Sequence, residues 1–297
     1  MSDASAPAPD APVRVERLPD PRAFLDEAGP FLERREAEHN LLFGIAATLI
    51  ADPQRPMTAP PQFVVVRRGD DIVAAAIMTP PYNLVLSSTD DPEAMPALAA
   101  EMGRARVHVP GLTAPPAMAK AFSDAWVGPR GQTAIRTMAE RIYRLERVIP
   151  VHGVPGTLRI ADAADRDLLI AWMHAFLTDA HGDPKDMEVE ILVDGALRTN
   201  SRTFSLWEVD GRPVSMAGVT GPTPHGIRVG PVYTPPADRG HGFASAVTAA
   251  ASQAQLDQGR RFVFLFTDLA NPTSNKIYQA IGYEPVIDID QWSFEPT

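Results

Sequence analysis

Two glycines, Gly240 and Gly242, stand between a strand-like run that ends at Pro235-Pro236 and a long helix-compatible segment. Glycine has no Cβ atom, so several backbone N–H groups of such a turn can approach one ligand closely. The first turn of the following helix adds unpaired N–H donors and the positive end of the helix dipole. Together these features predict an anion site over Arg239–Ser245 that suits a pyrophosphate.

The glycine pair alone is a weak signal, because a Gly-x-Gly also serves ordinary strand-to-helix turns. No Lys-Ser/Thr follows at the distance that a P-loop requires, so the segment is not a Walker motif. The order G-x-G-x-x-G is broken after Gly242, which argues against a dinucleotide fingerprint. The choice between a plain turn and an anion site therefore depends on what else accompanies the glycines.

A second pair of residues follows about 30 positions later. Asn271 and Tyr278 are seven residues apart, which is nearly two helical turns or roughly 10 Å along an axis, so both project from about the same side. Asn271 before Pro272 also suits a helix N-cap with proline at the first helical position. Tyr278 also suits packing against Ile281 and a sheet. Both alternatives stay open from the sequence.

The elements that must position these groups are predicted from the apolar pattern. We expect a helix over 161–178, strands over 203–209, 214–218 and 227–233, a helix over 243–258, and a buried strand over 261–267. A short helix over 273–281 should end at Gly282 as a C′ glycine, before strand-like pieces over 283–294. Strands that flank a central helix imply a mixed α/β sheet.

The two halves of the chain share a faint repeat. Phe63, Val73, Ala76, Thr79 and Pro81 recur 141 residues later as Phe204, Val214, Ala217, Thr220 and Pro222. Around both sets, a strand-like run, a tight polar turn and a second apolar run predict a hairpin. Residues 107–109 occupy the position in the first half that 262–266 occupies in the second, which predicts a strand there. Turn formers at 150–156 predict the boundary. We expect a disordered tail over 1–12, one domain over 13–150 and a second over 157–297.

The glycine loop resembles the R/Q-x-x-G-x-G/A motif of the GCN5-related N-acetyltransferase (GNAT) family, matched here by Arg239-Gly240-His241-Gly242-Phe243-Ala244. Residues 267–283 resemble that family's strand–Asn–helix–Tyr segment. The resemblance implies an α/β fold of two tandem acyl-CoA N-acyltransferase-like domains, each a mixed, mostly antiparallel sheet flanked by helices. Residues 87–101 of the first half carry no glycine, and their acidic residues would repel a pyrophosphate, so we interpret this half as a degenerate, non-catalytic copy.

By resemblance, the second domain transfers an acetyl group from acetyl-CoA to an amine by direct attack in a ternary complex. Tyr278 would be the general acid to the leaving thiolate, and an amide of Val232 or Tyr233 would stabilise the oxyanion. An amine must lose a proton, so a base is needed; Glu208 and Asp268, at strand ends, are the candidates. The coenzyme-binding residues that the resemblance implies are Val232, Tyr233, Thr234, Arg239, Gly240, His241, Gly242, Phe243, Ala244, Ser245, Asn271, Ser274 and Tyr278.

Two alternatives remain: an acyl-CoA-binding sensor or adaptor that does not turn over, and a transferase for oxygen acceptors or longer acyl chains. Composition narrows the partners. The net charge of −10 argues against a general nucleic-acid binder, and no apolar run reaches the length of a membrane span. With no cysteine and no signal peptide, we expect a cytoplasmic enzyme. The expected partners are acetyl-CoA as co-substrate and a small-molecule or peptide amine, with no metal and with a homodimer left open.

Overall fold

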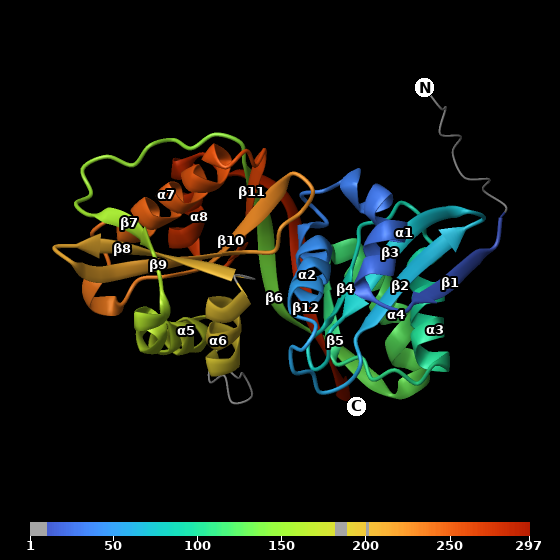
Figure 1. The fold of residues 1–297 in the computed structure, drawn as a ribbon. Coiled ribbons are helices and arrows are strands. Elements are labelled where there is room, and N and C mark those ends of the chain that lie inside the picture. Colours follow the sequence, from blue (N-terminus) through green and yellow to red (C-terminus); the bar gives the residue numbers. More distant parts are fainter. Residues whose placement is uncertain (1–10, 182–188, 200–201) are drawn as a thin grey trace, which may run out of the picture. The chain divides into compact units, whose positions relative to one another are not determined.

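The computed structural model describes residues 11–181, 189–199 and 202–297 (Figure 1). The predicted tail over 1–12 lies almost wholly outside this part. By contacts the chain divides into two compact units. Unit 1 comprises the residues up to Ala46, Pro56–Ile142 and Val286–Thr297, and unit 2 comprises Ala47–Arg55 and Tyr143–Pro285.

Unit 1 is built on a sheet in the order β1-β2-β3-β4-β5-β12-β6, in which β4 and β5 run parallel. Helices α3 and α4 bury apolar side chains such as Leu98 and Phe122 against this sheet. The elements of the first part of the chain and of its last strand are β1 (Val13–Leu18), α1 (Pro21–Glu33), α2 (Asn40–Ala51), β2 (Gln62–Arg68), β3 (Asp71–Met78), β4 (Leu84–Leu86), α3 (Ala94–Arg104), β5 (Gly111–Ala114), α4 (Pro116–Val127), β6 (Gln132–Leu145) and β12 (Glu284–Pro296).

Unit 2 contains the order β11-β10-β9-β8-β7, with β10 and β11 parallel and the other pairs antiparallel. One core holds Val247 of α7 with Ile281 of α8, and the other holds Leu169 of α5 with Val193 of α6. The elements are β7 (Thr157–Ile160), α5 (Arg166–His181), α6 (Val189–Thr199), β8 (Arg202–Val209), β9 (Arg212–Thr220), β10 (Gly226–Tyr233), α7 (Phe243–Asp257), β11 (Phe262–Asp268) and α8 (Pro272–Ile281).

The two predicted hairpins are present, and their registers repeat at the offset seen in the sequence. Val64 lies opposite Ala76 in β2–β3, and Ser205 lies opposite Ala217 in β8–β9. Each hairpin also has an irregularity at the matching step, between Val66 and Arg67 and between Trp207 and Glu208. An offset of 141 residues therefore relates the pairing as well as the residue types, which supports a duplication.

The prediction of a strand at 107–109 is wrong. Helix α3 ends at Arg104, and the Val107 amide donates to Met102 O at 3.0 Å, so this segment belongs to the end of the helix and not to a ladder. The strand is β5, which begins at Gly111.

Three further features differ from the sequence expectation. The strand pieces expected over 283–294 form one continuous strand, β12, which pairs with β5 of unit 1 through Gln291 opposite Thr113. The change between the compact units falls at Ile142–Tyr143, whereas the sequence predicts a domain boundary over 150–156. Helix α6 and strand β7 have no counterpart among the predicted elements.

Among the described residues, no helix combines the length and the apolar character that crossing a membrane requires. The same residues contain no group of three or more His, Cys, Asp or Glu side chains arranged to hold a metal ion.

Candidate functional site

Strand β10 separates from β11 part-way along its length. Parallel pairing covers Gly226 to Arg228 and does not continue beyond that residue. On its other side β10 pairs with β9, but a bulge lies between Val229 and Val232. Neighbouring amides of a strand point to opposite sides. The second half of β10 therefore presents alternate N–H groups toward the opened side.

The glycine loop leads from this opened strand into α7. Gly240 and Gly242 have φ values of 85° and 82°, in the left-handed region that favours glycine. The amide of Arg239 donates to Pro236 O at 3.3 Å, and the first helical bond runs from Ala246 N to Gly242 O at 3.0 Å. No hydrogen bond within the described chain uses the amides of Gly240–Ser245. They are the donors of a free helix N-terminus.

An ion pair between Asp238 and Arg212 anchors the segment just before the glycine loop. Asp238 is 8 % exposed, and its two carboxylate oxygens accept from Arg212 Nη1 and Nη2 at 3.0 and 2.7 Å. Hydrogen bonding to Arg212 holds the pKa of Asp238 below its ordinary value. The Arg239 side chain points away from the loop amides, because Nε donates to Thr234 O at 2.9 Å and Nη2 to Asp179 at 2.6 Å. The backbone of this loop, rather than the Arg239 side chain, is left to bind an anion.

The two glycines are required for different reasons. A Cβ at Gly242 would lie 2.9 Å from Val154 Cγ2, in addition to the strain of its positive φ. A Cβ at Gly240 would meet nothing within 4 Å, so it would project into open space beside the free amides.

The remaining predicted residues of β10 face different ways. Tyr233 is buried near Trp172 of α5, with ring centroids 6.1 Å apart, whereas Val232 packs toward the α7–α8 core. The buried Ser215 hydroxyl lies 2.8 Å from Thr234 Oγ1 and donates to Tyr233 O at 3.0 Å. The Thr234 hydroxyl is therefore engaged with the sheet. His241 is exposed, and its ring stacks on Phe243 at 5.6 Å.

Helix α8 begins with the cap that the sequence offers as an alternative role for Asn271. Asn271 Oδ1 accepts from the Ser274 amide at 3.0 Å. Asn275, which was not predicted as a site residue, donates to Asp268 O at 2.9 Å, and its Oδ1 accepts from the Tyr143 hydroxyl at 3.1 Å. These contacts fix the start of α8 to the end of β11. In the sequence, the only indication of this role is that Asn275 is a polar residue one helical turn after the capping residue Asn271.

Tyr278 lies one helical turn beyond Ser274 on α8. Burial raises the pKa of Tyr278 to about 12, and the hydrogen bond with the Ser274 side chain opposes this shift. The neutral phenol is therefore the form present near pH 7, and it can donate a hydrogen bond. Tyr278 also contacts Tyr283 edge-on, with ring centroids 6.1 Å apart.

The two candidate bases occupy different surroundings. Glu208 accepts from Arg159 Nε at 2.7 Å, on a strand two positions away from β10. Strands are spaced about 4.8 Å apart, so this carboxylate lies about 10 Å from β10 across the sheet. Asp268 ends β11, beside the opened part of β10, and one of its oxygens accepts from the Ala270 amide at 2.8 Å. Of the two carboxylates, Asp268 lies nearer to the opened part of β10, so the geometry favours it as the candidate base.

Residues 166–283 match the family model of the acetyltransferase (GNAT) family. Residues 166–283 therefore form a GNAT domain. This match spans α5 to α8 and contains the glycine loop and Tyr278, so the segment is called the GNAT domain below. No match is found among curated protein sequences.

Solved structures extend the likeness to the whole chain at the level of fold. A tandem GNAT protein from the clavulanic acid biosynthesis pathway is 15 % identical, with a TM-score of 0.58 over 96 % of this chain and 99 % of that one. A GNAT-family acetyltransferase from Colwellia psychrerythraea is 11 % identical, with a TM-score of 0.54 over 95 % and 100 %. A GCN5-related N-acetyltransferase from Kribbella flavida is 19 % identical, with a TM-score of 0.53 over 84 % and 96 %. The fold is thus that of tandem GNAT proteins.

The segment of unit 1 that corresponds to the glycine loop of the GNAT domain is filled by its own side chains. The Ser88 amide, just after β4, donates to Nε2 of the buried His39 at 3.1 Å. Asp91 and Glu93, at the start of α3, pair with Arg68 at 2.6 and 2.7 Å. Carboxylates thus stand where the GNAT domain has free amides. This arrangement agrees with the interpretation of the first half as a degenerate copy.

The match of residues 166–283 to the GNAT family supports acyltransferase activity in general. The family uses acetyl-CoA as the acyl donor and acts on amines of small molecules or peptides. The free amides at the start of α7 fit the diphosphate of such a donor, because they offer several N–H groups to one anion.

Proposed function

We propose that the GNAT domain is an N-acetyltransferase that moves the acetyl group of acetyl-CoA to an amine of a small molecule or peptide. The observation that carries this proposal is the set of free amides over Gly240–Ser245, next to the opened half of β10. A diphosphate bound by these amides places the rest of the coenzyme arm along the opened strand.

The reaction would proceed by direct attack of the neutral amine on the thioester in a ternary complex. One of the amides of Val232 and Tyr233 points to the opened side of β10, and it would donate to the carbonyl oxygen as negative charge develops there. Tyr278 would donate its hydroxyl proton toward the departing sulfur. With a pKa of about 12 it is a weaker acid than an ordinary tyrosine, so hydrogen bonding to the thiolate is its main contribution.

Deprotonation of the amine needs a base, and we propose Asp268. It stands at the end of β11, and Ala270 N–H engages only one of its oxygens. Glu208, the other candidate, forms an ion pair with Arg159 and lies on β8, two strands away from β10. Asn271, whose Oδ1 caps α8, would bind the coenzyme arm through its side-chain N–H₂ group, which has no partner among the described residues.

A second candidate is a coenzyme-binding sensor or adaptor without turnover. The observation that favours it is that each carboxylate candidate already has a partner, Arg159 for Glu208 and Ala270 N–H for Asp268. Both proposals require acetyl-CoA binding, so the release of free thiol across a panel of amines separates them. Hydroxyl acceptors and longer acyl-CoA donors in the same panel test the remaining alternative of oxygen or long-chain transfer.

The binding step is tested by the thermal shift of the full chain with acetyl-CoA, compared with free adenosine phosphates. The variant is Gly240→Ala, and the matched control is Gly259→Ala. Both glycines have a positive φ, 85° and 91°, and neither added Cβ would meet an atom within 4 Å. The two variants should therefore lose similar stability. Only Gly240→Ala should weaken acetyl-CoA binding, by about tenfold or more, because its methyl group projects beside the free amides.

Equal acetyl-CoA affinity of Gly240→Ala and Gly259→Ala would remove the loop from coenzyme binding. If acetyl-CoA binds but no amine in the panel causes release of free thiol, the sensor is supported and the transferase is excluded.

A further inference from the structure

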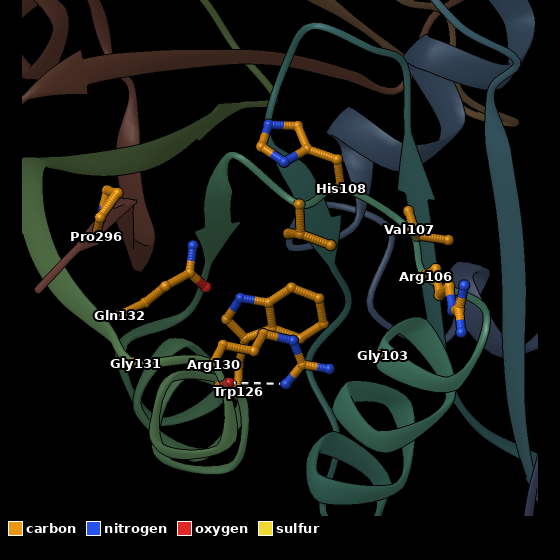
Figure 2. A pocket seen from close by; sticks show the side chains of 10 residues that line it. Gly103, Arg106, Val107, His108, Trp126, Arg130, Gly131, Gln132 and Pro296 are labelled. Atoms are coloured by element: carbon orange, nitrogen blue, oxygen red, sulfur yellow. Dashed lines mark hydrogen bonds between the residues drawn. The ribbon is translucent and has the colours of Figure 1, made fainter.

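Unit 1 contains a cavity of about 460 Å³, which was not predicted from the sequence. It lies where the end of α3, the segment before β5, the end of α4 and the start of β6 meet (Figure 2). This volume is within the range of small-molecule sites in proteins. Its lining residues are Gly103, Arg106, Val107, His108, Val109, Trp126, Arg130, Gly131, Gln132 and Pro296, and they define what is called the unit 1 cavity below.

The charge of this lining is opposite to that of the protein. The chain carries a net charge of −10, yet the lining contains Arg106, Arg130 and His108 and no carboxylate. Neither arginine has an acidic partner among the residues that the structure describes. Most other arginines in the described chain are paired, as Arg68 is with Asp91. A cavity with uncompensated positive charge attracts anions.

Arg130 is held in place by the walls of the cavity. Its guanidinium lies 3.5 Å from the centre of the Trp126 ring, and Nη1 donates to Trp126 O at 2.8 Å (Figure 2). On its other side it lies against Gly103, where any side chain would collide with Nη2. Only a glycine at 103 leaves room for this arrangement. A pre-positioned guanidinium loses less conformational entropy when it binds an oxyanion.

Arg106 reaches the cavity through an unusual backbone conformation. It follows the end of α3 with a φ of 53°, at a position where helices favour glycine. A residue with a Cβ is strained there. Glycine at this position would be more stable, so the presence of arginine indicates that its side chain has a role.

Two polar atoms of the lining lack partners. Trp126 is 3 % exposed, and its Nε1 has no hydrogen-bond acceptor; Gln132 Oε1 likewise has no donor. Figure 2 shows the two atoms pointing toward one another across the wall of the cavity. A buried donor without an acceptor costs free energy. Turning the partly buried Gln132 side chain would open the indole N–H to a ligand oxygen.

We propose that the unit 1 cavity binds a small organic anion that carries a carboxylate or a phosphate. Arg130 and Arg106 bind the anionic oxygens, Trp126 Nε1 donates to a further oxygen, and Gln132 Oε1 accepts from a hydroxyl of the ligand. Val107, Val109 and Pro296 contact its carbon atoms. This site is distinct in sequence from the glycine loop and does not depend on the reaction of the GNAT domain.

The test uses isothermal titration of the full chain with citrate, 3-phosphoglycerate and inorganic phosphate, and with glycerol as a neutral probe, each up to about 1 mM, which detects weak metabolite binding. The two organic probes distinguish carboxylates from phosphate esters. The variants are Arg106→Gly, Arg130→Gln and Trp126→Phe. The matched control is Arg104→Gln, because Arg104 ends the same helix but pairs with Glu101 and does not line the cavity.

We expect citrate or 3-phosphoglycerate to bind and glycerol not to bind. Arg106→Gly should raise the dissociation constant about tenfold or more while keeping or raising the melting temperature, because glycine suits the left-handed backbone. Arg130→Gln should act in the same direction, and Trp126→Phe more weakly. Arg104→Gln should leave the dissociation constant within about twofold, as expected for a charge outside the site.

Three outcomes would overturn the proposal. The first is that no anion binds the unmodified protein. The second is that Arg104→Gln weakens binding as much as Arg106→Gly, which would indicate a diffuse effect of surface charge. The third is that binding survives Arg106→Gly but is lost in Gly240→Ala, which would assign the anion to the glycine loop.

Discussion

Arg212 and Asp238 form a two-pronged ion pair that connects the first residue of β9 to the segment just before the glycine loop. Asp238 is buried, whereas most of the Arg212 side chain is in solvent. The pair therefore braces the backbone that must present the amides of Gly240–Ser245, without itself reaching a ligand there. The ion pair thus contributes to binding only by positioning the loop backbone.

Replacing Arg212 with Gln should weaken acetyl-CoA binding by about three- to tenfold, because a loop that is less well held pays more entropy on binding. The turnover number at saturating acetyl-CoA should change little. Titration calorimetry and steady-state kinetics check the two effects separately. Arg166→Gln is a suitable control, because it breaks a two-pronged ion pair with Asp194 that involves neither the glycine loop nor a candidate base. Equal affinities in both variants would contradict the bracing role.

The same pair predicts a dependence of stability on acidity. Arg212 holds the pKa of Asp238 below its ordinary value of 3.8. The carboxylate therefore contributes stability above about pH 4, and the contribution is lost as the pH falls further and the group is protonated. Asp238→Asn should show a shallower loss of melting temperature over this acidic range. Parallel curves for the two proteins would mean that the ion pair contributes little.

Tyr278→Phe should lower the turnover number by about a hundredfold, because the departing thiolate loses the hydrogen bond that the phenol donates. The affinity for acetyl-CoA should stay nearly unchanged. Because the pKa of Tyr278 is about 12, its ionisation should not limit the rate below about pH 11. Tyr283→Phe is the control: Tyr283 shares a hydrogen bond of 2.8 Å with Ser252, so it should lose stability but keep turnover. Unchanged thiol release by Tyr278→Phe removes Tyr278 from the reaction.

Asp268→Asn tests the proposed base. An asparagine keeps the oxygen that accepts from Ala270 N–H, so the turn after β11 should survive while the proton acceptor is lost. The turnover number should fall about a hundredfold. Glu208→Gln should leave it within about threefold and should lower the melting temperature, because Arg159 loses a charged partner. A reversed order of the two effects would assign the base to Glu208.

His39 gives unit 1 its own dependence on pH. The ring is 2 % exposed, with Nδ1 bonded to Leu32 O at 2.9 Å and Nε2 to the Ser88 amide. Burial lowers the pKa of His39 below 6.5. Its neutral form therefore contributes stability above about pH 6.5, which is lost as the pH falls and the ring must be charged or exposed. In His39→Gln the decline between about pH 6.5 and pH 5 should flatten; an unchanged slope in denaturant titrations would refute this.

Much of the site was readable from local sequence. The glycines at 240 and 242, the long helix after them, and the C′ glycine at 282 each depend on the conformational freedom of one residue and on its immediate neighbours. The repeat at an offset of 141 likewise predicted two hairpins, because cross-strand neighbours in a hairpin are close in sequence. The structure adds that even the irregular step of each hairpin is repeated.

The sequence by itself therefore determined the glycine turn, the helix that follows it, and the family of residues 166–283. Only the tertiary structure shows that β12 pairs with β5 and that Arg159 forms an ion pair with Glu208. The same holds for the hydrogen bond from the Ser88 amide to His39. It also holds for the cavity that Arg106 and Arg130 line together. Each of these depends on partners far apart in the chain. Residue types and spacing carry no record of such pairing, because long-range contacts are selected by packing and charge only once the whole unit is formed.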